Sequence, residues 1–336
     1  MTAAAMPKRS NTSLTPLRDL VASDLAQVNQ VISDHGHSSI SLINDLTSHI
    51  VAAGGKRLRP SLTIAAAKLC GYEGPRHIKL AAAVEFIHTA TLLHDDVVDA
   101  SNLRRGEPTA NAVWGNKTSV LVGDFLLSRA FQLMVADGSL DVLKTLSDAS
   151  AIISAGEVHQ LMVSHDLAIT QTVYEEVISA KTAALFAAAC ELGAIVSDKP
   201  QWRAALRSYG QNLGMAFQIV DDALDYQASE ADIGKAIGDD FRDGKVTLPV
   251  IFAYEAANES EKAFWQSALD SGDVLDPATL RRAKELMLKH DAFAKTFQVA
   301  RRFADAACAD LALIESNSTA KQALIDAAQF AVERSH

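Results

Sequence analysis

Long proline-free stretches constrain the fold of this chain more than any other feature of the sequence. The 336 residues include only eight prolines, and residues 109–199, 201–248 and 278–336 contain none. Apolar residues recur there at intervals of three and four, as at Leu121 and Phe125, and the strong helix formers Ala and Leu are abundant. Alternating strand patterns are hard to find. The sequence therefore predicts an all-α fold.

No shift in composition divides the chain, so we expect a single domain. Residues 16–336 are predicted to form it, with residues 1–15 as a disordered lead-in. Asp276-Pro277 is predicted to start a helix, because Asp is a good N-cap and Pro fits the first helical position. Glycine, proline and polar clusters predict breaks between helices near residues 54–55, 71–75, 104–109, 136–139, 197–200, 233–245 and 257–261.

The composition excludes several classes of function. The net charge of −10 argues against a nucleic-acid partner, whose phosphates require a basic surface. Cys70, Cys190 and Cys308 are far apart and show no metal-ligand spacing, which suits a reducing cytosol. The N-terminus lacks the apolar segment of a secretory signal, and the most apolar run, residues 183–190, is too short to span a membrane. We expect a soluble, cytoplasmic protein without stable membrane insertion.

An acidic pattern, with aspartates at positions i, i+1 and i+4, occurs twice in apolar surroundings. The first motif consists of Asp95, Asp96 and Asp99, and the second of Asp221, Asp222 and Asp225. Side chains on an α-helix advance by about 100° per residue, so the three carboxylates of each motif share one face. Like charges crowded in this way repel one another, and a cation would compensate for them. Because clustered carboxylates suit Mg²⁺, the two motifs predict a magnesium-assisted clamp for a diphosphate.

Basic residues follow each acidic motif on loops that contain glycine. Arg104 and Arg105 come after the first motif, where their guanidinium groups either bind phosphate oxygens or neutralise the aspartates. Lys235 and Lys245 come after the second motif. Between them, Asp240 is either a further ligand of metal or water or part of a solvated turn.

Three further basic features are ambiguous when each is taken alone. The segment 54–59 carries Lys56 and Arg59 on a glycine turn that lacks the spacing of a P-loop, so it is either a phosphate site or a solvated turn. Lys181 lies in an Ala-rich helix and is either buried against an anion or extended to the surface. His88 lies about 20° from Asp95 on the helix wheel, which is compatible with a ligand contact or a structural histidine.

Taken together, these segments resemble the trans-polyprenyl diphosphate synthases, in particular the bacterial octaprenyl, solanesyl and decaprenyl diphosphate synthases. The resemblance covers roughly residues 40 to 335. It rests on the order of the blocks Gly54–Pro60, Leu93–Asp99, Arg104–Gly106, Lys181-Thr182, Gly214–Asp225 and Gly244–Pro249. The family implies a bundle of antiparallel helices around a central cavity (the isoprenoid synthase fold), and usually a homodimer.

The resemblance also implies roles for the motif residues, with Mg²⁺ as the cofactor. Asp95 and Asp99 would bind two ions that hold an allylic diphosphate, and Asp221 would hold a third, while Asp96, Asp222 and Asp225 complete the catalytic motifs. Arg104, Lys181 and Lys235 would contact the allylic diphosphate, and Lys245 would also bind substrate. Lys56, Arg59, His88 and Arg105 would hold isopentenyl diphosphate. Thr182 and Gln218 would line the path of the developing carbocation.

Product length is predicted from the residues just before the first motif. The family places the floor of the product channel at the fourth and fifth residues before the motif, where short-chain enzymes carry aromatic residues. Here these positions hold Thr91 and Ala90, and Ile87 shares their flank of the helix. Small side chains at this floor favour a long product, from octaprenyl to decaprenyl, for a quinone side chain; ordinary close packing of helices would also explain them.

Three other functions remain as alternatives. A shorter-chain farnesyl or geranylgeranyl diphosphate synthase shares every motif. A class I terpene cyclase normally replaces the second aspartate motif and lacks the basic cluster that binds isopentenyl diphosphate. An accessory subunit of a heteromeric synthase typically has degraded aspartate motifs, whereas both motifs are intact here. The exact product, the preferred primer, the oligomeric state and the pathway that uses the product remain open.

Overall fold

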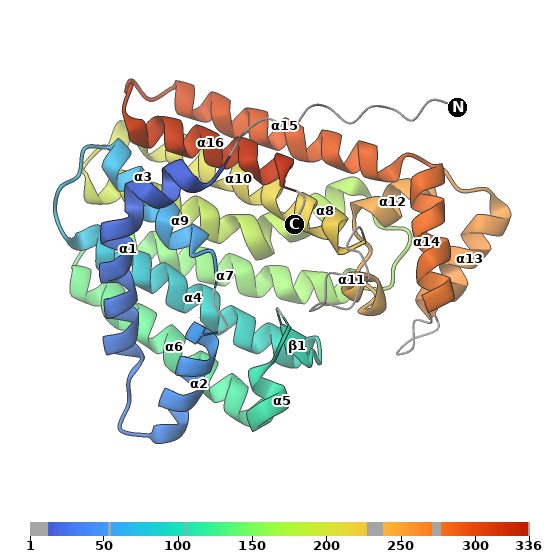
Figure 1. The fold of residues 1–336 in the computed structure, drawn as a ribbon, viewed down its shortest axis with the longest axis horizontal. Coiled ribbons are helices and arrows are strands. Elements are labelled where there is room, and N and C mark those ends of the chain that lie inside the picture. Colours follow the sequence, from blue (N-terminus) through green and yellow to red (C-terminus); the bar gives the residue numbers. More distant parts are fainter. Residues whose placement is uncertain (1–12, 53–54, 105, 227–237, 271–276, 335–336) are drawn as a thin grey trace.

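The protein is a bundle of long helices. The computed structural model describes residues 13–52, 55–104, 106–226, 238–270 and 277–334, and Figure 1 shows their helices packed along one another. The all-α prediction is confirmed, with one exception. A two-stranded antiparallel hairpin occurs in the loop after the first acidic motif, and it pairs Leu103 with Pro108 and Arg104 with Glu107.

The elements follow one another along the chain with short connections. They are α1 (Thr15–Gly36), α2 (Ser41–Ala52), α3 (Leu58–Leu69), α4 (Arg76–Val98), β1 (Leu103–Arg104), β2 (Glu107–Pro108), α5 (Ala110–Trp114), α6 (Asn116–Asp137), α7 (Leu140–Val163), α8 (Gln171–Ile178), the π-helix η1 (Ser179–Ala183), α9 (Ala184–Val196), α10 (Pro200–Asp225), α11 (Asp239–Arg242), α12 (Leu248–Glu255), α13 (Glu259–Asp270), α14 (Pro277–Lys289), α15 (Ala292–Ala312) and α16 (Thr319–Glu333).

Most of the predicted breaks fall between these elements; α14 is described from Pro277 on, and the Asp276 of the predicted helix start lies outside the described residues. Within the described residues, five other breaks were not predicted, at residues 37–40, 115, 164–170, 290–291 and 313–318. At the N-terminal end of the described residues, Leu14 is buried and α1 begins at Thr15.

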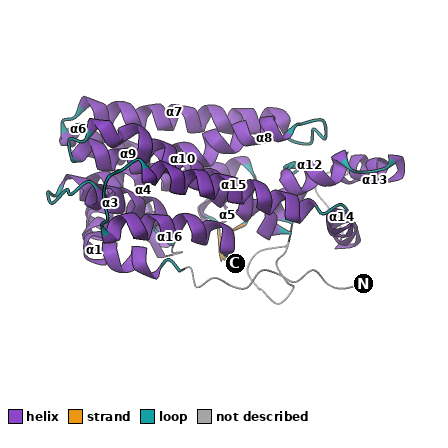
Figure 2. Cartoon of the chain, turned by 90° about the horizontal axis from the view of Figure 1, so that it is seen from above, coloured by secondary structure: helices purple, strands orange, loops and turns teal. Residues whose placement is uncertain are grey.

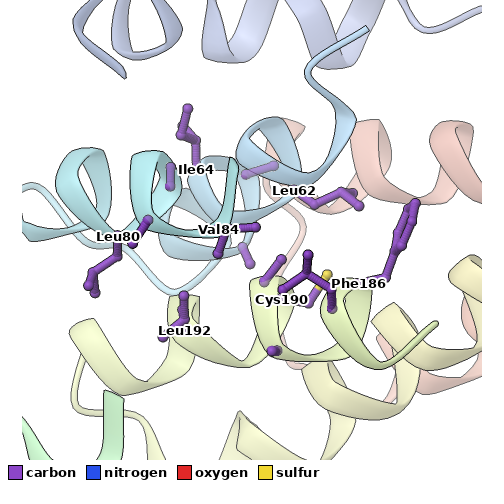
Figure 3. Packing of buried hydrophobic residues seen from close by; sticks show 14 of the residues in the cluster. Leu62, Ile64, Leu80, Val84, Phe186, Cys190 and Leu192 are labelled. Atoms are coloured by element: carbon purple, nitrogen blue, oxygen red, sulfur yellow. The ribbon is translucent and has the colours of Figure 1, made fainter. Parts of the chain in front are cut away.

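The larger hydrophobic core lies between α3, α4 and α9, with α1, α7, α10 and α16 around it. Figure 3 shows Leu62 and Ile64 of α3, Leu80 and Val84 of α4, and Phe186, Cys190 and Leu192 of α9. Alanines are numerous at these contacts and let the helices approach closely. A Cβ added at Gly193 of α9 would lie 2.5 Å from the carbonyl carbon of Ala66 on α3, so only glycine fits there.

A second core joins the carboxyl end of α10 to α8 and to the helices α12, α13, α14 and α15. Figure 2 shows α12, α13 and α14 gathered at one end of the bundle, beyond α8. The acidic motifs lie at the carboxyl ends of α4 and α10, and the two cores meet along α10, where Leu213 belongs to the first and Met215 to the second. The site is therefore supported by both cores.

Two described helical stretches have the length and hydropathy of a membrane span, Asn116–Asp137 and Gln171–Val196. Most of Gln171–Val196 is buried inside the bundle, as is usual for a core helix of a soluble protein. Asn116–Asp137, which is α6, buries a smaller share and exposes Leu121 and Val135. These features give only weak evidence for a membrane span.

Candidate active site

The first acidic motif occupies the last turn of α4. No basic residue lies in this turn, so the partial negative charge of the helix end adds to the repulsion among the aspartates. Asp96 is buried and accepts from Arg104, whose Nη2 lies 2.7 Å from Asp96 Oδ1. The backbone carbonyl of Asp96 also accepts from Asn111 at 3.1 Å. In this structure Arg104 therefore neutralises an aspartate, one of the two roles considered for it.

Asp95 faces a lysine that is shared with a second carboxylate. Lys181 Nζ lies 3.8 Å from Asp95 Oδ2 and 2.6 Å from Glu157 Oε2 of α7. Burial raises the pKa of Asp95 to about 7, with Lys181 opposing the shift and with Glu157 and Asp99 adding to it. Of the two alternatives for Lys181, the structure therefore shows the one in which the lysine is partly buried against an anionic partner. Glu157 is a site residue that the sequence did not predict.

Lys245 connects the two halves of the site. Its Nζ lies 2.9 Å from Asp99 Oδ2 of the first motif, 3.2 Å from Asp243 Oδ2 and 3.8 Å from Asp240 Oδ1. Burial alone would lower the pKa of Lys245, but the carboxylates of Asp240, Asp99 and Asp243 outweigh it and raise the pKa. One ammonium group therefore holds carboxylates that are far apart in the sequence, and Asp240 belongs to the site rather than to a solvated turn.

The three aspartates of the second motif, at the end of α10, differ in their surroundings. Asp221 is the accessible one, with a side chain 45% exposed, and Arg334 Nη1 from the C-terminal end of the chain lies 3.2 Å from its Oδ1. Asp222 is buried and accepts from Tyr174 at 2.5 Å and from Gln218 at 2.6 Å. Asp225 Oδ2 accepts from the backbone N–H of Asp240 at 3.2 Å and so supports the first turn of α11.

Close helix contacts place Thr182 against Gln218. The Thr182 hydroxyl donates to Gln218 Oε1 at 2.9 Å. Thr182 lies in η1, a single π turn between α8 and α9, and such turns are frequent at functional sites. Gly214, one turn before Gln218, makes the contact possible, because a Cβ there would lie 2.7 Å from Ala183 Cα.

The basic cluster before α3 meets α4 near His88. Arg59 Nη1 lies 3.1 Å from His88 Nε2, and its guanidinium carbon lies 4.4 Å above the centre of the Phe186 ring. Lys56 is exposed, and Arg57 forms an ion pair with the buried Glu85 of α4. The structure thus brings together Arg59 and His88, which the resemblance assigned to one substrate. Arg105 and Lys235 lie outside the described residues.

The predicted channel floor lies inside the bundle. Ile87 and Ala90 are fully buried, and the partly buried Thr91 donates its hydroxyl to the carbonyl of His88 at 2.8 Å. A pocket of about 110 Å³ opens elsewhere in the site, between α7, α8, η1, α10 and residues 245–247. Its lining includes Lys181, but neither Ala90 nor Thr91.

No group of three His, Cys, Asp or Glu side chains forms a preformed metal site within the part of the chain that the structure describes. The carboxylates nevertheless fit Mg²⁺. This ion usually takes one or two protein carboxylates and completes its shell with waters and substrate phosphates, so it needs no all-protein cage. Asp95 and Asp99 lie at a helix end that favours cations, and Asp221 is accessible from solvent.

Tyr174, Asp243 and Arg334 join Glu157 as site residues that the sequence reasoning did not single out. Glu157 follows Gly156, and a Cβ at Gly156 would lie 2.7 Å from the Ala180 Cβ. A glycine followed by an acidic residue inside a long helix was therefore the one sequence feature that could have indicated Glu157 as a site residue. Arg334 is separated from Asp221 by more than a hundred residues and carries no local signal.

A family model and curated proteins match most of the chain. Residues 40–287 match the family model "Polyprenyl synthetase". The octaprenyl diphosphate synthase of Escherichia coli K12 is 44% identical over 326 residues, which cover 96% of this chain and 99% of that protein.

Two solved structures extend the likeness to the fold. A polyprenyl synthase from Caulobacter crescentus CB15, complexed with calcium and isoprenyl diphosphate, has a TM-score of 0.93 and 49% identity and covers 98% of this chain and 100% of its own. A decaprenyl diphosphate synthase from Rhodobacter capsulatus has a TM-score of 0.90 and 49% identity over 96% of this chain and 100% of its own. The chain therefore belongs to the polyprenyl synthetase family and is a prenyltransferase.

Proposed function

We propose that this chain is a long-chain all-trans polyprenyl diphosphate synthase, which adds isopentenyl diphosphate units to an allylic diphosphate primer. The strongest support for this reaction class is the position of Lys245. It binds Asp99 of the first motif together with Asp240 and Asp243, which follow the second motif. Two acidic helix ends and a shared cation at one place form a receptor for a diphosphate and its counter-ions. Octaprenyl and decaprenyl synthases at 44% and 49% identity support a long product.

The first step breaks the allylic C–O bond and leaves a carbocation and a diphosphate with added negative charge. Lys181, Lys245 and Arg104 are placed to neutralise that charge, because each already pairs with a motif carboxylate or its neighbour. Mg²⁺, held by Asp95, Asp99 and Asp221, would supply Lewis-acid stabilisation of the leaving group. Lys235, outside the described residues, is proposed as a further diphosphate contact.

The carbocation forms beside Thr182 and Gln218. The carbonyl oxygen of Gln218 and the Thr182 hydroxyl present oxygen dipoles that stabilise positive charge without adding a nucleophilic anion. Isopentenyl diphosphate is held by Lys56, Arg59, His88 and Arg105, and its double bond attacks the cation. The released diphosphate takes the proton that is then lost, so the reaction needs no protein base. The apolar walls of the site exclude water, which would quench the cation.

Product length is set by the flank of α4 below the first motif. Ile87 and Ala90 are buried there, and Thr91 adds only a small side chain. Because no aromatic ring fills these positions, a growing chain can pass the level at which a short-chain enzyme stops. The proposal commits to products from octaprenyl to decaprenyl, destined for a quinone side chain, rather than farnesyl or geranylgeranyl products.

A homodimer is proposed from the surface of α6 and α7. Large apolar side chains are exposed along both helices, among them Leu121 and Val135 on α6 and Val158, Leu161 and Met162 on α7. Exposed apolar side chains on consecutive helices favour an association surface there. The proposed location is the cytoplasm. Of the two apolar helical stretches among the described residues, the more buried one, Gln171–Val196, packs inside the bundle and is not available to a membrane.

One assay tests the reaction and the alternatives together. Purified protein is incubated with Mg²⁺, farnesyl diphosphate and labelled isopentenyl diphosphate, and the products are sized by chromatography after dephosphorylation. Label in C40 to C50 alcohols supports the proposal. Label that stops at C15 or C20 identifies a shorter-chain synthase. Label-free hydrocarbons from the primer alone identify a cyclase, and activity that appears only with a second subunit identifies an accessory chain.

A further inference from the structure

A chain of buried hydrogen bonds crosses the site from η1 through α10 to α8. The Thr182 hydroxyl donates to Gln218 Oε1 at 2.9 Å, Gln218 Nε2 donates to Asp222 Oδ1 at 2.6 Å, and the Tyr174 hydroxyl donates to Asp222 Oδ2 at 2.5 Å. Thr182, Asp222 and Tyr174 are all buried. Tyr174, on α8, belongs to none of the motif blocks, although it lines the same pocket as Thr182 and Gln218.

The direction of these bonds decides which end of the Gln218 amide faces the pocket. An amide carries two donors on nitrogen and an acceptor oxygen, and its orientation follows from its partners. Gln218 Nε2 donates to Asp222 and Gln218 Oε1 accepts from Thr182, so the amide nitrogen faces Asp222 and the carbonyl oxygen faces Thr182. The other oxygen of Asp222 is fixed by Tyr174. Both oxygens are therefore taken by uncharged donors, which suits an anchoring role for this aspartate.

We propose that Tyr174 is a positioning residue: it holds Asp222, and through Asp222 it fixes the Gln218 amide with the carbonyl oxygen toward Thr182. The consequence for catalysis rests on the proposed function, because the oriented carbonyl acts on a carbocation in the adjacent pocket. Preorganised dipoles are effective only if they need not reorient during the reaction. Tyr174 acts through its hydroxyl, which is its hydrogen bond to Asp222, while its ring packs in the second core and lines the pocket.

The test is a double-mutant cycle on Tyr174→Phe and Gln218→Ala. If Tyr174 acts through Gln218, Tyr174→Phe lowers kcat about tenfold in the wild-type background and has no further effect in the Gln218→Ala background. KM for both substrates and the Mg²⁺ requirement stay within about twofold, because the Tyr174 hydroxyl is taken by Asp222 and the ring that lines the pocket is kept in phenylalanine. Equal losses in both backgrounds, or no loss in either, would overturn the proposal.

Tyr209→Phe is the matched control. Tyr209 is fully buried on α10, and its hydroxyl donates to the Leu324 carbonyl at 2.8 Å, outside the hydrogen-bond chain. This variant should lose stability comparable to Tyr174→Phe in thermal melts but keep its kcat. If Tyr209→Phe lowers kcat as much as Tyr174→Phe, the effect is a general loss of packing and the proposal fails.

A structural measurement separates this proposal from the reaction itself. In a crystal structure of Tyr174→Phe, we expect Gln218 to turn and the contact from Thr182 Oγ1 to Gln218 Oε1 to lengthen beyond about 3.5 Å. An unchanged contact contradicts the positioning role whatever the enzyme makes. Failure of the wild-type protein to elongate a primer would instead contradict the proposed function and leave this geometric test intact.

Discussion

Substituting Gly214 by Ala tests whether the contact between η1 and α10 sets the geometry of the site. A Cβ at this position would lie 2.7 Å from Ala183 Cα, 2.9 Å from Ala183 Cβ and 3.2 Å from Phe186 Cβ. Carbon atoms in contact normally lie about 3.5–4.0 Å apart, and all three of these neighbours belong to the backbone or are bonded directly to it. We therefore expect α10 to move away from η1 by about 1 Å.

The expected loss is small in stability and large in activity. Overpacking of a core costs about 1–3 kcal/mol, and the higher helix propensity of Ala returns up to about 1 kcal/mol, so unfolding becomes easier by roughly 0–2 kcal/mol. The displacement falls on the Thr182–Gln218 contact, because Thr182 precedes Ala183 and Gln218 lies one turn beyond Gly214. A misplacement of about 1 Å can cost on the order of 100-fold in rate, and we expect kcat to fall by that factor.

The assay combines initial rates of isopentenyl diphosphate incorporation with thermal melts followed by circular dichroism. Gly193→Ala is the matched control, since its Cβ would clash with the Ala66 backbone where α9 meets α3, away from the pocket. It should destabilise at least as much as Gly214→Ala but lower kcat less than about tenfold. A Gly214→Ala enzyme with kcat within threefold of wild type, or a control that loses equal activity, would refute the reasoning.

Three further predictions concern the product channel and the metal. Thr91→Phe or Ala90→Phe places a ring on the buried flank of α4 and should shorten the products sharply in chromatography; an unchanged length would show that the channel lies elsewhere. Asp95→Ala and Asp221→Ala should each lower turnover by at least about 100-fold while the melting temperature stays near that of wild type, and near-normal rates would contradict the metal clamp. EDTA should abolish incorporation and added Mg²⁺ should restore it, whereas full activity in EDTA would rule out a divalent ion.

The helices could be predicted because their signals are local. Proline-free stretches and three-to-four spacing predicted the long helices, such as α6 and α7. The break at residues 164–170 was missed, because that segment contains neither glycine nor proline and its turn depends on tertiary contacts such as the His165 N–H with the Gly244 carbonyl at 2.8 Å. The hairpin at Leu103–Pro108 is too short for a periodic pattern to reveal it.

The site residues that belong to a local sequence motif could be predicted, whereas those that tertiary packing brings to the site could not. Both aspartate motifs stand out because three carboxylates share a helix face, but their equal spacing hides unequal roles. Only the packed structure shows that Asp222 is buried between two donors while Asp221 stays accessible. Glu157 and Arg334 reach the site from remote helices, and single charged residues of this kind have no signature in one sequence.

The π turn at residues 179–183 also fixes how long this part of the chain can be. Because α8, η1 and α9 run without a loop, the wider turn absorbs a residue that an α-helix could not hold. Deleting one residue inside the turn would let it tighten to α geometry while α8 and α9 keep their relative orientation. A deletion elsewhere in α8 or α9 has no wide turn to absorb it and rotates one half of the continuous helix by about 100° against the other, so that either Lys181 leaves the site or Phe186 leaves the core. A scan of single-codon deletions should therefore find them tolerated in the 164–170 connection but inactivating in the regular parts of α8 and α9.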